Sequence, residues 1–208
     1  GVAFYENRLY NASSITPETL AAMEKDIAGS VALIRPGERL DVVAFGCTSG
    51  AMVIGEQRVC ERIREARPGV ACTTPITAAL AGLNALKARR IALLTPYVRS
   101  ISDWMGRYIE ERGIRVVRAG SYEHENDNEV ARIDAASIRR AVLELGRDDS
   151  VDAVFVSCTS LRVAAQVKAL EAEIGKPVTS SNHAMAWHAL RLAGVGDRLP
   201  ALGRLFEA

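Results

Sequence analysis

The 208-residue chain carries 26 Lys and Arg residues against 25 Asp and Glu residues, so its formal net charge is +1. This balance, and the lack of a basic tract interleaved with aromatic residues, disfavours nucleic acid or an anionic membrane as a partner. No apolar run approaches the ~18 residues that span a bilayer, and the first residues do not resemble a signal peptide. We therefore expect a cytoplasmic protein that acts on a small molecule, built as one large domain or two small ones.

The four cysteines do not form a disulfide framework, and no Cys-x-x-Cys or His/Cys cluster has the spacing of zinc ligands. In a reducing compartment all four would remain thiols. The sequence predicts no metal site. We expect Cys60 and Cys72 to be small core residues, the usual role of a free cysteine.

Strand and helix patterns alternate along the first half of the chain. Thr16 is a predicted N-cap with Pro17 at the first helical position, and Pro36-Gly37 ends that helix. The predicted elements, in order, are a strand at 2–5, a helix from 17 to about 35, strands at 41–45 and 70–72, a helix between them at 53–66, and a helix from about 75 to 86.

The same order begins again near residue 90. A helix capped by Asp134 presents one apolar face, and Gly175 is a predicted C-cap. The predicted strands lie at 91–94, 114–117, 152–156 and 178–181, and the predicted helices at 102–113, about 135–145, from Cys158 to Gly175, and 184–192. Alternating strands and helices predict an α/β fold with parallel sheets.

One stretch occurs twice in register. Residues 40–50 align with 151–161 at an offset of 158 − 47 = 111, with five identities that include Cys-Thr-Ser in both copies. Laying the halves over each other gives four strands in the second half and three in the first. The repeat therefore predicts that the opening strand of the first half is absent and that roughly 30 residues precede Gly1.

The two Cys-Thr-Ser turns are the candidate site. Cys47 and Cys158 each follow a strand and are predicted to open a helix, where unpaired amides and the helix dipole can lower a thiol pKa from about 8.5 to ~3.5–7.5. The hydroxyl donors that follow them suit a carboxylate ligand: Thr48, Ser49, Thr159 and Ser160. Facing lobes would place one thiol on each side of an anionic substrate, which suits two-sided chemistry at one carbon. A structural role for both cysteines and a disulfide switch between them remain alternatives.

Six motifs, two of which contain the Cys-Thr-Ser turns, carry a resemblance to a known family. They are Gly46-Cys47-Thr48-Ser49, Thr73-Thr74-Pro75, residues 92–97, Val130-Ala131-Arg132-Ile133, Ser157-Cys158-Thr159-Ser160-Leu161-Arg162, and Thr179-Ser180-Ser181-Asn182 with Trp187 and residues 190–194. In this combination, over nearly the whole length, the chain resembles the Asp/Glu racemase superfamily. Within it, the resemblance is to the branch of maleate cis-trans isomerases, arylmalonate decarboxylases and racemase-like proteins of ectoine utilisation.

The resemblance implies two pseudo-symmetric Rossmann-like lobes, each with a parallel four-stranded sheet, a site in the cleft between them, and no metal or organic cofactor. We expect lobe 1 at residues 1–88, with 179–208 packing back on it, and lobe 2 at 89–178. The resemblance also implies a homodimer or homotetramer. A small carboxylate or dicarboxylate is the expected partner.

Residue roles also follow from the resemblance. Cys47 corresponds to the nucleophile that adds to the double bond of maleate, and Cys158 to the group that gives or takes the proton. Tyr97 corresponds to a tyrosine that hydrogen-bonds a substrate carboxylate. Asn128, or less well Asn126, corresponds to a substrate-binding asparagine. A further asparagine lies in the family after the opening strand that this chain lacks.

Several alternatives stay open. The decarboxylases of the branch lack the first cysteine, so Cys47 disfavours that reaction. A racemase of an acidic or diamino acid would use the same two thiols, and a two-lobed carboxylate-binding protein would use the cleft without chemistry. His183 as a base, Arg162 as a carboxylate partner and the polar residues 123–129 as a lid are further hypotheses.

Overall fold

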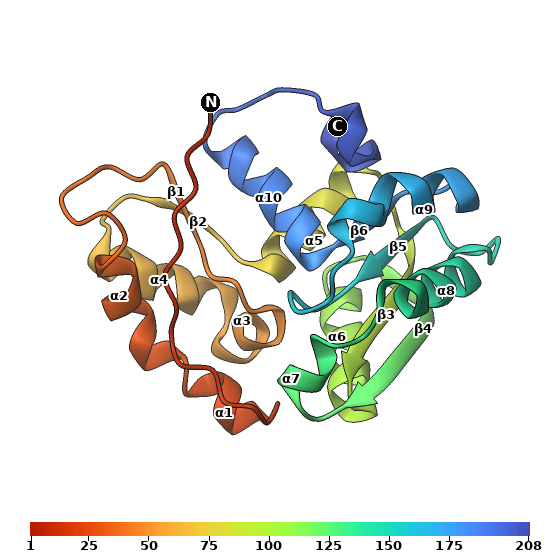
Figure 1. The fold of residues 1–208 in the computed structure, drawn as a ribbon, viewed down its shortest axis with the longest axis horizontal. Coiled ribbons are helices and arrows are strands. Elements are labelled where there is room, and N and C mark those ends of the chain that lie inside the picture. The colour runs from red at the N-terminus through yellow and green to blue at the C-terminus, as the bar shows by residue number, and fades with distance from the viewer.

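The computed structural model describes all 208 residues as an α/β molecule with two parallel sheets (Figure 1). Its elements, in order, are α1 (Pro17–Ala21), α2 (Glu24–Ala32), β1 (Val42–Ala44), α3 (Thr48–Ile54), α4 (Glu56–Ala66), β2 (Ala71–Thr73), α5 (Pro75–Ala85), β3 (Arg90–Tyr97), α6 (Arg99–Glu110), β4 (Arg115–His124), α7 (Asp127–Val130), α8 (Ala135–Gly146), β5 (Ala153–Val156), η1 (Ala164–Gln166), α9 (Val167–Ile174), β6 (Val178–Ser180), α10 (Ser181–Leu192), η2 (Pro200–Leu202) and η3 (Arg204–Glu207). None of the helices combines the length and the apolar character needed to cross a membrane.

The larger sheet belongs to the second lobe and has the strand order β4-β3-β5-β6, all parallel. All four strands predicted for this half are confirmed. β5 is buried along its whole length, because β3 and β6 flank it and helices cover it. The carboxyl ends of β3 and β5 point toward the first lobe, so their last residues meet that lobe (Figure 1).

The first lobe has only two paired strands, β1 and β2. The strand expected at residues 2–5 is wrong, since residues 1–12 contain no helix or strand. The side chain of Phe4 is 84% exposed and that of Val2 67% exposed. These residues have strand-forming side chains, but a strand needs a hydrogen-bonded neighbour, and none lies beside them.

The predicted helix boundaries hold where a local cap defines them. Thr16 and Asp134 accept hydrogen bonds at the starts of α1 and α8, and Gly175 ends α9 in the left-handed conformation. The helix expected from 17 to 35 is divided into α1 and α2. The helix expected directly after Cys158 is wrong, because residues 159–160 form a turn, residues 161–163 are irregular, and the next helical residue is Ala164.

α5 and α10 pack against each other in the centre of the molecule, and both also contact β6 of the second lobe (Figure 1). α10 also contacts β1 and β2, while β6, which precedes it, lies in the sheet of the second lobe. One cluster of 44 buried apolar residues runs through both lobes. The lobes therefore share a core, and the turns at the strand ends lie at the junction.

Candidate active site

Cys47 lies at the end of β1 and is the N-cap of α3, with its sulfur accepting a hydrogen bond from the amide of Gly50 at 3.4 Å. A side chain at Gly50 would crowd its neighbours. A Cβ there would lie 3.1 Å from Cys47 Sγ and would collide with Met23 Cε. The sulfur can reach this amide because position 50 is glycine.

Cys158 follows β5 but takes a different backbone conformation. Its φ is 94°, a value that residues with a Cβ rarely adopt. The amide of Ser160 donates to its sulfur at 3.4 Å, within a turn and not at a helix start. The two copies of Cys-Thr-Ser thus hold their sulfurs by different local structures, and the backbone strain is confined to Cys158.

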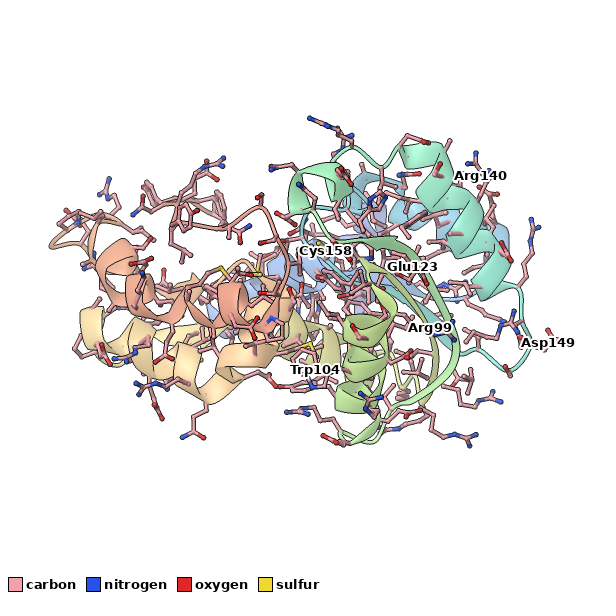
Figure 2. All side chains as sticks on the ribbon, turned by 90° about the horizontal axis from the view of Figure 1, so that it is seen from below. Arg99, Trp104, Glu123, Arg140, Asp149 and Cys158 are labelled. Atoms are coloured by element: carbon pink, nitrogen blue, oxygen red, sulfur yellow. The ribbon has the colours of Figure 1, made fainter.

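The two turns are joined directly across the lobe junction. Thr159 Oγ1 donates to the carbonyl oxygen of Gly46 at 3.0 Å. Ser181 Oγ lies 2.8 Å from Thr48 Oγ1 and accepts the amide hydrogen of Cys158 at 3.0 Å. Figure 2 shows Cys158 at this junction between the two halves of the ribbon. These hydrogen bonds hold the backbone of one cysteine turn against the other.

A cavity of about 240 Å³ opens at the junction. Its polar end holds most of the predicted site residues: Cys47, Thr48, Ser49, Tyr97, Cys158, Thr159 and Ser160. Asp127 also lines it and is the only charged side chain that does so. Its carboxylate accepts from Ser160 Oγ at 3.2 Å and from Asn11 Nδ2 at 3.1 Å.

The other candidates lie outside the cavity lining. Asn128 is exposed, and Asn126 accepts the Asn128 amide hydrogen as the N-cap of α7. His183 is buried in α10 between Thr179 Oγ1 and the carbonyl oxygen of Leu202, which is the setting of a structural residue.

The remaining polar candidates are also solvated or structural. The side chain of Arg162 is exposed. Of the polar stretch 123–129, residues 123–124 end β4 and residues 127–129 begin α7, so the stretch is not one continuous loop. No three His, Cys, Asp or Glu side chains are grouped to hold a metal ion. All four cysteines are free thiols, and Cys60 and Cys72 lie away from the cavity.

The pKa values of Cys47 and Cys158 are raised, whereas the sequence predicts that a helix N-terminus lowers them. Burial raises the pKa of Cys47 to about 11, and the hydrogen bonds from Gly50 and Ser49 offset only part of that rise. Burial also raises the pKa of Cys158. The charge of Asp127 adds to both increases. The predicted lowering by a helix N-terminus is wrong, because desolvation of a thiolate outweighs the amide donors.

Tyr97 connects the second lobe to both sulfurs. It ends β3, is buried, and lines the cavity together with Cys47, Ser49 and Cys158. Burial and the two neighbouring thiols raise its pKa well above 10, so it stays protonated and acts as a donor. Donation to Cys158 lowers the pKa of that thiol and opposes the effect of burial.

Two residues of this site were not identified as functional from the sequence. In the sequence, Ser181 belongs only to a motif, whereas its hydroxyl contacts Thr48 across 133 positions of the chain. Asp127 belongs to the polar stretch 123–129. The available signals are a serine at the start of α10, directly after β6, and an acidic residue at the start of α7, but neither indicates a contact with the cysteine turns.

Known proteins resemble this chain along most of its length. A family model described as arylmalonate decarboxylase matches residues 13–206. The arylmalonate decarboxylase of Bordetella bronchiseptica is 34% identical over 147 residues, which are 70% of this chain and 61% of that protein. The maleate isomerase of Nocardia farcinica is 28% identical over 213 residues, which are 99% of this chain and 84% of that protein.

One solved structure that resembles this chain contains a covalent intermediate. It is the Nocardia farcinica maleate cis-trans isomerase, as a cysteine-to-serine mutant with a covalently bound succinylcysteine intermediate. It superposes with a TM-score of 0.81 at 27% identity, covering 94% of this chain and 82% of that one.

Proposed function

Because this chain belongs to the arylmalonate decarboxylase family, we propose that it catalyses a cofactor-independent isomerisation of a small carboxylate, with maleate to fumarate as the reaction. The observation that carries the proposal is the pair of thiols, Cys47 and Cys158, on one cavity between the lobes. A succinylcysteine in a maleate isomerase of similar structure supports a covalent route through one cysteine. Because Cys47 is present, we do not propose decarboxylation.

In the proposed first step, the Cys47 thiolate forms a bond to one alkene carbon of maleate. The π electrons move to the neighbouring carbon, which takes the proton of Cys158. The product is a succinyl thioether in which the former double bond is single and rotates. Cys158, now a thiolate, then removes a proton from the same carbon, the double bond re-forms, and the C–S bond breaks to return the electron pair to Cys47.

The hydrogen-bond donors around the cavity suit these reaction steps. Thr48, Ser49 and Ser160 offer hydroxyls at the cavity, and Tyr97 lines it together with Cys158. These groups would hold the carboxylates and stabilise the carbanion that forms beside one of them. The raised pKa of Cys158 suits a proton donor, whereas Cys47 must lose its proton before it attacks.

The test is proton NMR of the reduced protein with maleate in deuterated buffer. We expect the fumarate signal to grow, to vanish in Cys47→Ser, and to persist in Cys60→Ser, which removes a thiol away from the cavity. Unchanged turnover in Cys47→Ser would refute the assignment of the nucleophile.

A second reaction, racemisation of an amino acid, is favoured by Asp127. A carboxylate lining the cavity repels a dianion but attracts a substrate ammonium group. In this reaction one thiolate removes the α-proton and the other thiol returns a proton to the opposite face. Loss of the α-proton signal from aspartate, glutamate or a diamino acid in deuterated buffer, with maleate unchanged, would select this reaction over the isomerisation.

A further inference from the structure

The pairing of β3 with β4 becomes irregular just before the cavity. Thr95 pairs with Ser121. Two residues later Tyr97 pairs with His124, so β4 uses three residues where β3 uses two. The extra residue forms a bulge, in which Glu123 takes a φ of 56°. Bulges turn side chains in new directions beside active sites, and the residue of β3 at this bulge, Tyr97, is the one that lines the cavity with the two thiols.

Two serine hydroxyls hold the backbone at this point. Ser102 Oγ, near the start of α6, donates to the carbonyl oxygen of Tyr97 at 3.0 Å, its shortest contact with a carbonyl. Ser121 Oγ, on β4, donates to the same oxygen. In the regular part of β3, by contrast, the carbonyl oxygen of Leu94 accepts the amide hydrogen of Ser157. A carbonyl oxygen has two lone pairs, so the two serines together satisfy that of Tyr97.

The neighbours of the two serines direct their protons to this carbonyl. Thr95 Oγ1 lies 2.6 Å from Ser102 Oγ and is the donor of that pair, since the Ser102 proton is used on Tyr97. The amide of Glu123, in the bulge, donates to Ser121 Oγ at 3.1 Å. Each serine thus accepts one hydrogen bond and has a single proton left to donate. The end of β3, the bulge in β4 and the start of α6 are therefore joined at one oxygen atom.

The helix that follows Tyr97 begins without a capping side chain. Val98 is the N-cap of α6, and its side chain makes no capping hydrogen bond, because valine has no acceptor to offer. Ser102, in the same helix, is bonded instead to the carbonyl oxygen that precedes the cap. The two serines therefore give this junction the fixed geometry that a capping side chain usually provides.

We propose that Ser102 and Ser121 are positioning residues for Tyr97: their hydroxyls fix the carbonyl at the end of β3, and the fixed backbone directs the phenol toward the thiols. Neither serine lines the thiol cavity. Both line a separate cavity of about 130 Å³, formed by β3, β4 and α6. Their effect on the thiols therefore passes through Tyr97. The inference rests on the proposed function for the roles of Tyr97 and Cys158, and it holds whichever reaction the thiols catalyse.

A change in the position of the phenol would alter the reactivity of Cys158. The hydrogen bond from Tyr97 lowers the pKa of this thiol, so a weaker bond leaves a smaller fraction of thiolate, the form that reacts. Asp127 and Cys47 also interact with this sulfur, and the variants proposed below leave both residues unchanged. The reactivity of Cys158 therefore reports how well Tyr97 is positioned.

The test is the rate at which iodoacetamide alkylates Cys158 at pH 8, followed in its own peptide by mass spectrometry. It needs no substrate, so its outcome is separate from that of the NMR assay. Ser121→Val and Ser121→Thr have the same shape, suit a strand and differ only in the hydroxyl, and the 130 Å³ cavity beside position 121 has room for the added carbons. We expect Ser121→Val to slow alkylation about three- to fivefold and Ser121→Thr to keep the rate within about twofold.

A double-mutant cycle separates positioning from a general loosening of the lobe. Tyr97→Phe keeps the ring and removes the hydroxyl, and it should slow alkylation of Cys158 about tenfold. Adding Ser121→Val to Tyr97→Phe should cause no further slowing, because the serine acts through the phenol. If Ser121→Val slows the reaction by the same factor with and without the Tyr97 hydroxyl, or speeds it in both cases, the proposal is overturned.

Ser102→Ala tests the second hydroxyl independently, and it decides the question if Ser121→Val does not fold. We expect it to slow alkylation of Cys158 about threefold, again only while the Tyr97 hydroxyl is present. Ser150→Ala is the matched control. The Ser150 hydroxyl bonds Asp148 before the amino end of β5, whereas Cys158 follows its carboxyl end, so the rate should not change. Unchanged rates in both Ser121→Val and Ser102→Ala, or equal slowing in Ser150→Ala, would overturn the proposal.

Discussion

The hydroxyls of Thr48 and Ser181 lie 2.8 Å apart and join the first cysteine turn to the start of α10. The same Ser181 oxygen accepts the amide hydrogen of Cys158, so one side chain ties together the two halves of the site. The spacing of the two sulfurs therefore depends on a residue that touches neither of them.

Ser181→Ala is expected to destabilise the protein by about 1–3 kcal/mol, because it leaves the buried Cys158 amide without an acceptor. Turnover should fall by a larger factor than in Ser180→Ala. Ser180 is the N-cap of α10, and its hydroxyl bonds the amide of His183 and neither cysteine turn. Urea denaturation and the NMR assay measure the two effects, and equal losses of turnover would contradict the positioning role.

The rate of the proposed isomerisation should rise with pH. Cys47 attacks as a thiolate, and with a pKa of about 11 its thiolate fraction grows tenfold for each pH unit below that value. Cys158 must keep its proton, and its raised pKa preserves that form over the same range. We expect log kcat/KM to increase with a slope near one between about pH 6 and 9. A flat profile would mean that the attacking group is already ionised.

Replacing Cys158 separates the role of its sulfur from the strain of its backbone. Both Cys158→Ala and Cys158→Gly remove the thiol and should abolish turnover. At φ 94°, however, glycine avoids the strain that alanine retains. The free energy of unfolding of Cys158→Gly should therefore exceed that of Cys158→Ala by about 1 kcal/mol. The glycine variant should accordingly unfold at a higher urea concentration. The opposite order would show that the turn relaxes when the sulfur is lost.

Asp127→Asn removes the only charge on the cavity wall while keeping the shape of the side chain. The charge of Asp127 raises the pKa of both thiols, so the variant should lower them. The larger thiolate fraction would speed alkylation by iodoacetamide at pH 8 by about two- to threefold. Asp149→Asn, at an exposed position far from the junction (Figure 2), should leave the rate unchanged. Equal rates in the two variants would contradict the electrostatic effect.

Most of the fold could be predicted because its signals are local. Thr16, Asp134 and Gly175 define helix ends through bonds within a few residues, and the apolar runs of β3 and β5 are long enough to specify buried strands. The expected strand at residues 2–5 failed because strand formation depends on a partner elsewhere in the chain.

The site was only partly predictable, for a similar reason. Identical Cys-Thr-Ser letters suggested identical turns, yet Cys158 takes a positive φ and Thr159 bonds the distant Gly46. The thiol pKa values depend on burial, which follows from how the two lobes pack, and the role of Ser181 depends on contacts made across the lobe junction. No pattern within a short window carries that information.

The contacts around Gly50 restrict which substitutions can be made next to Cys47. A Cβ at position 50 would lie 3.1 Å from Cys47 Sγ and would collide with Met23 Cε, so a side chain there requires the sulfur and the end of Met23 to move. Libraries that aim to widen the substrate range should leave position 50 untouched.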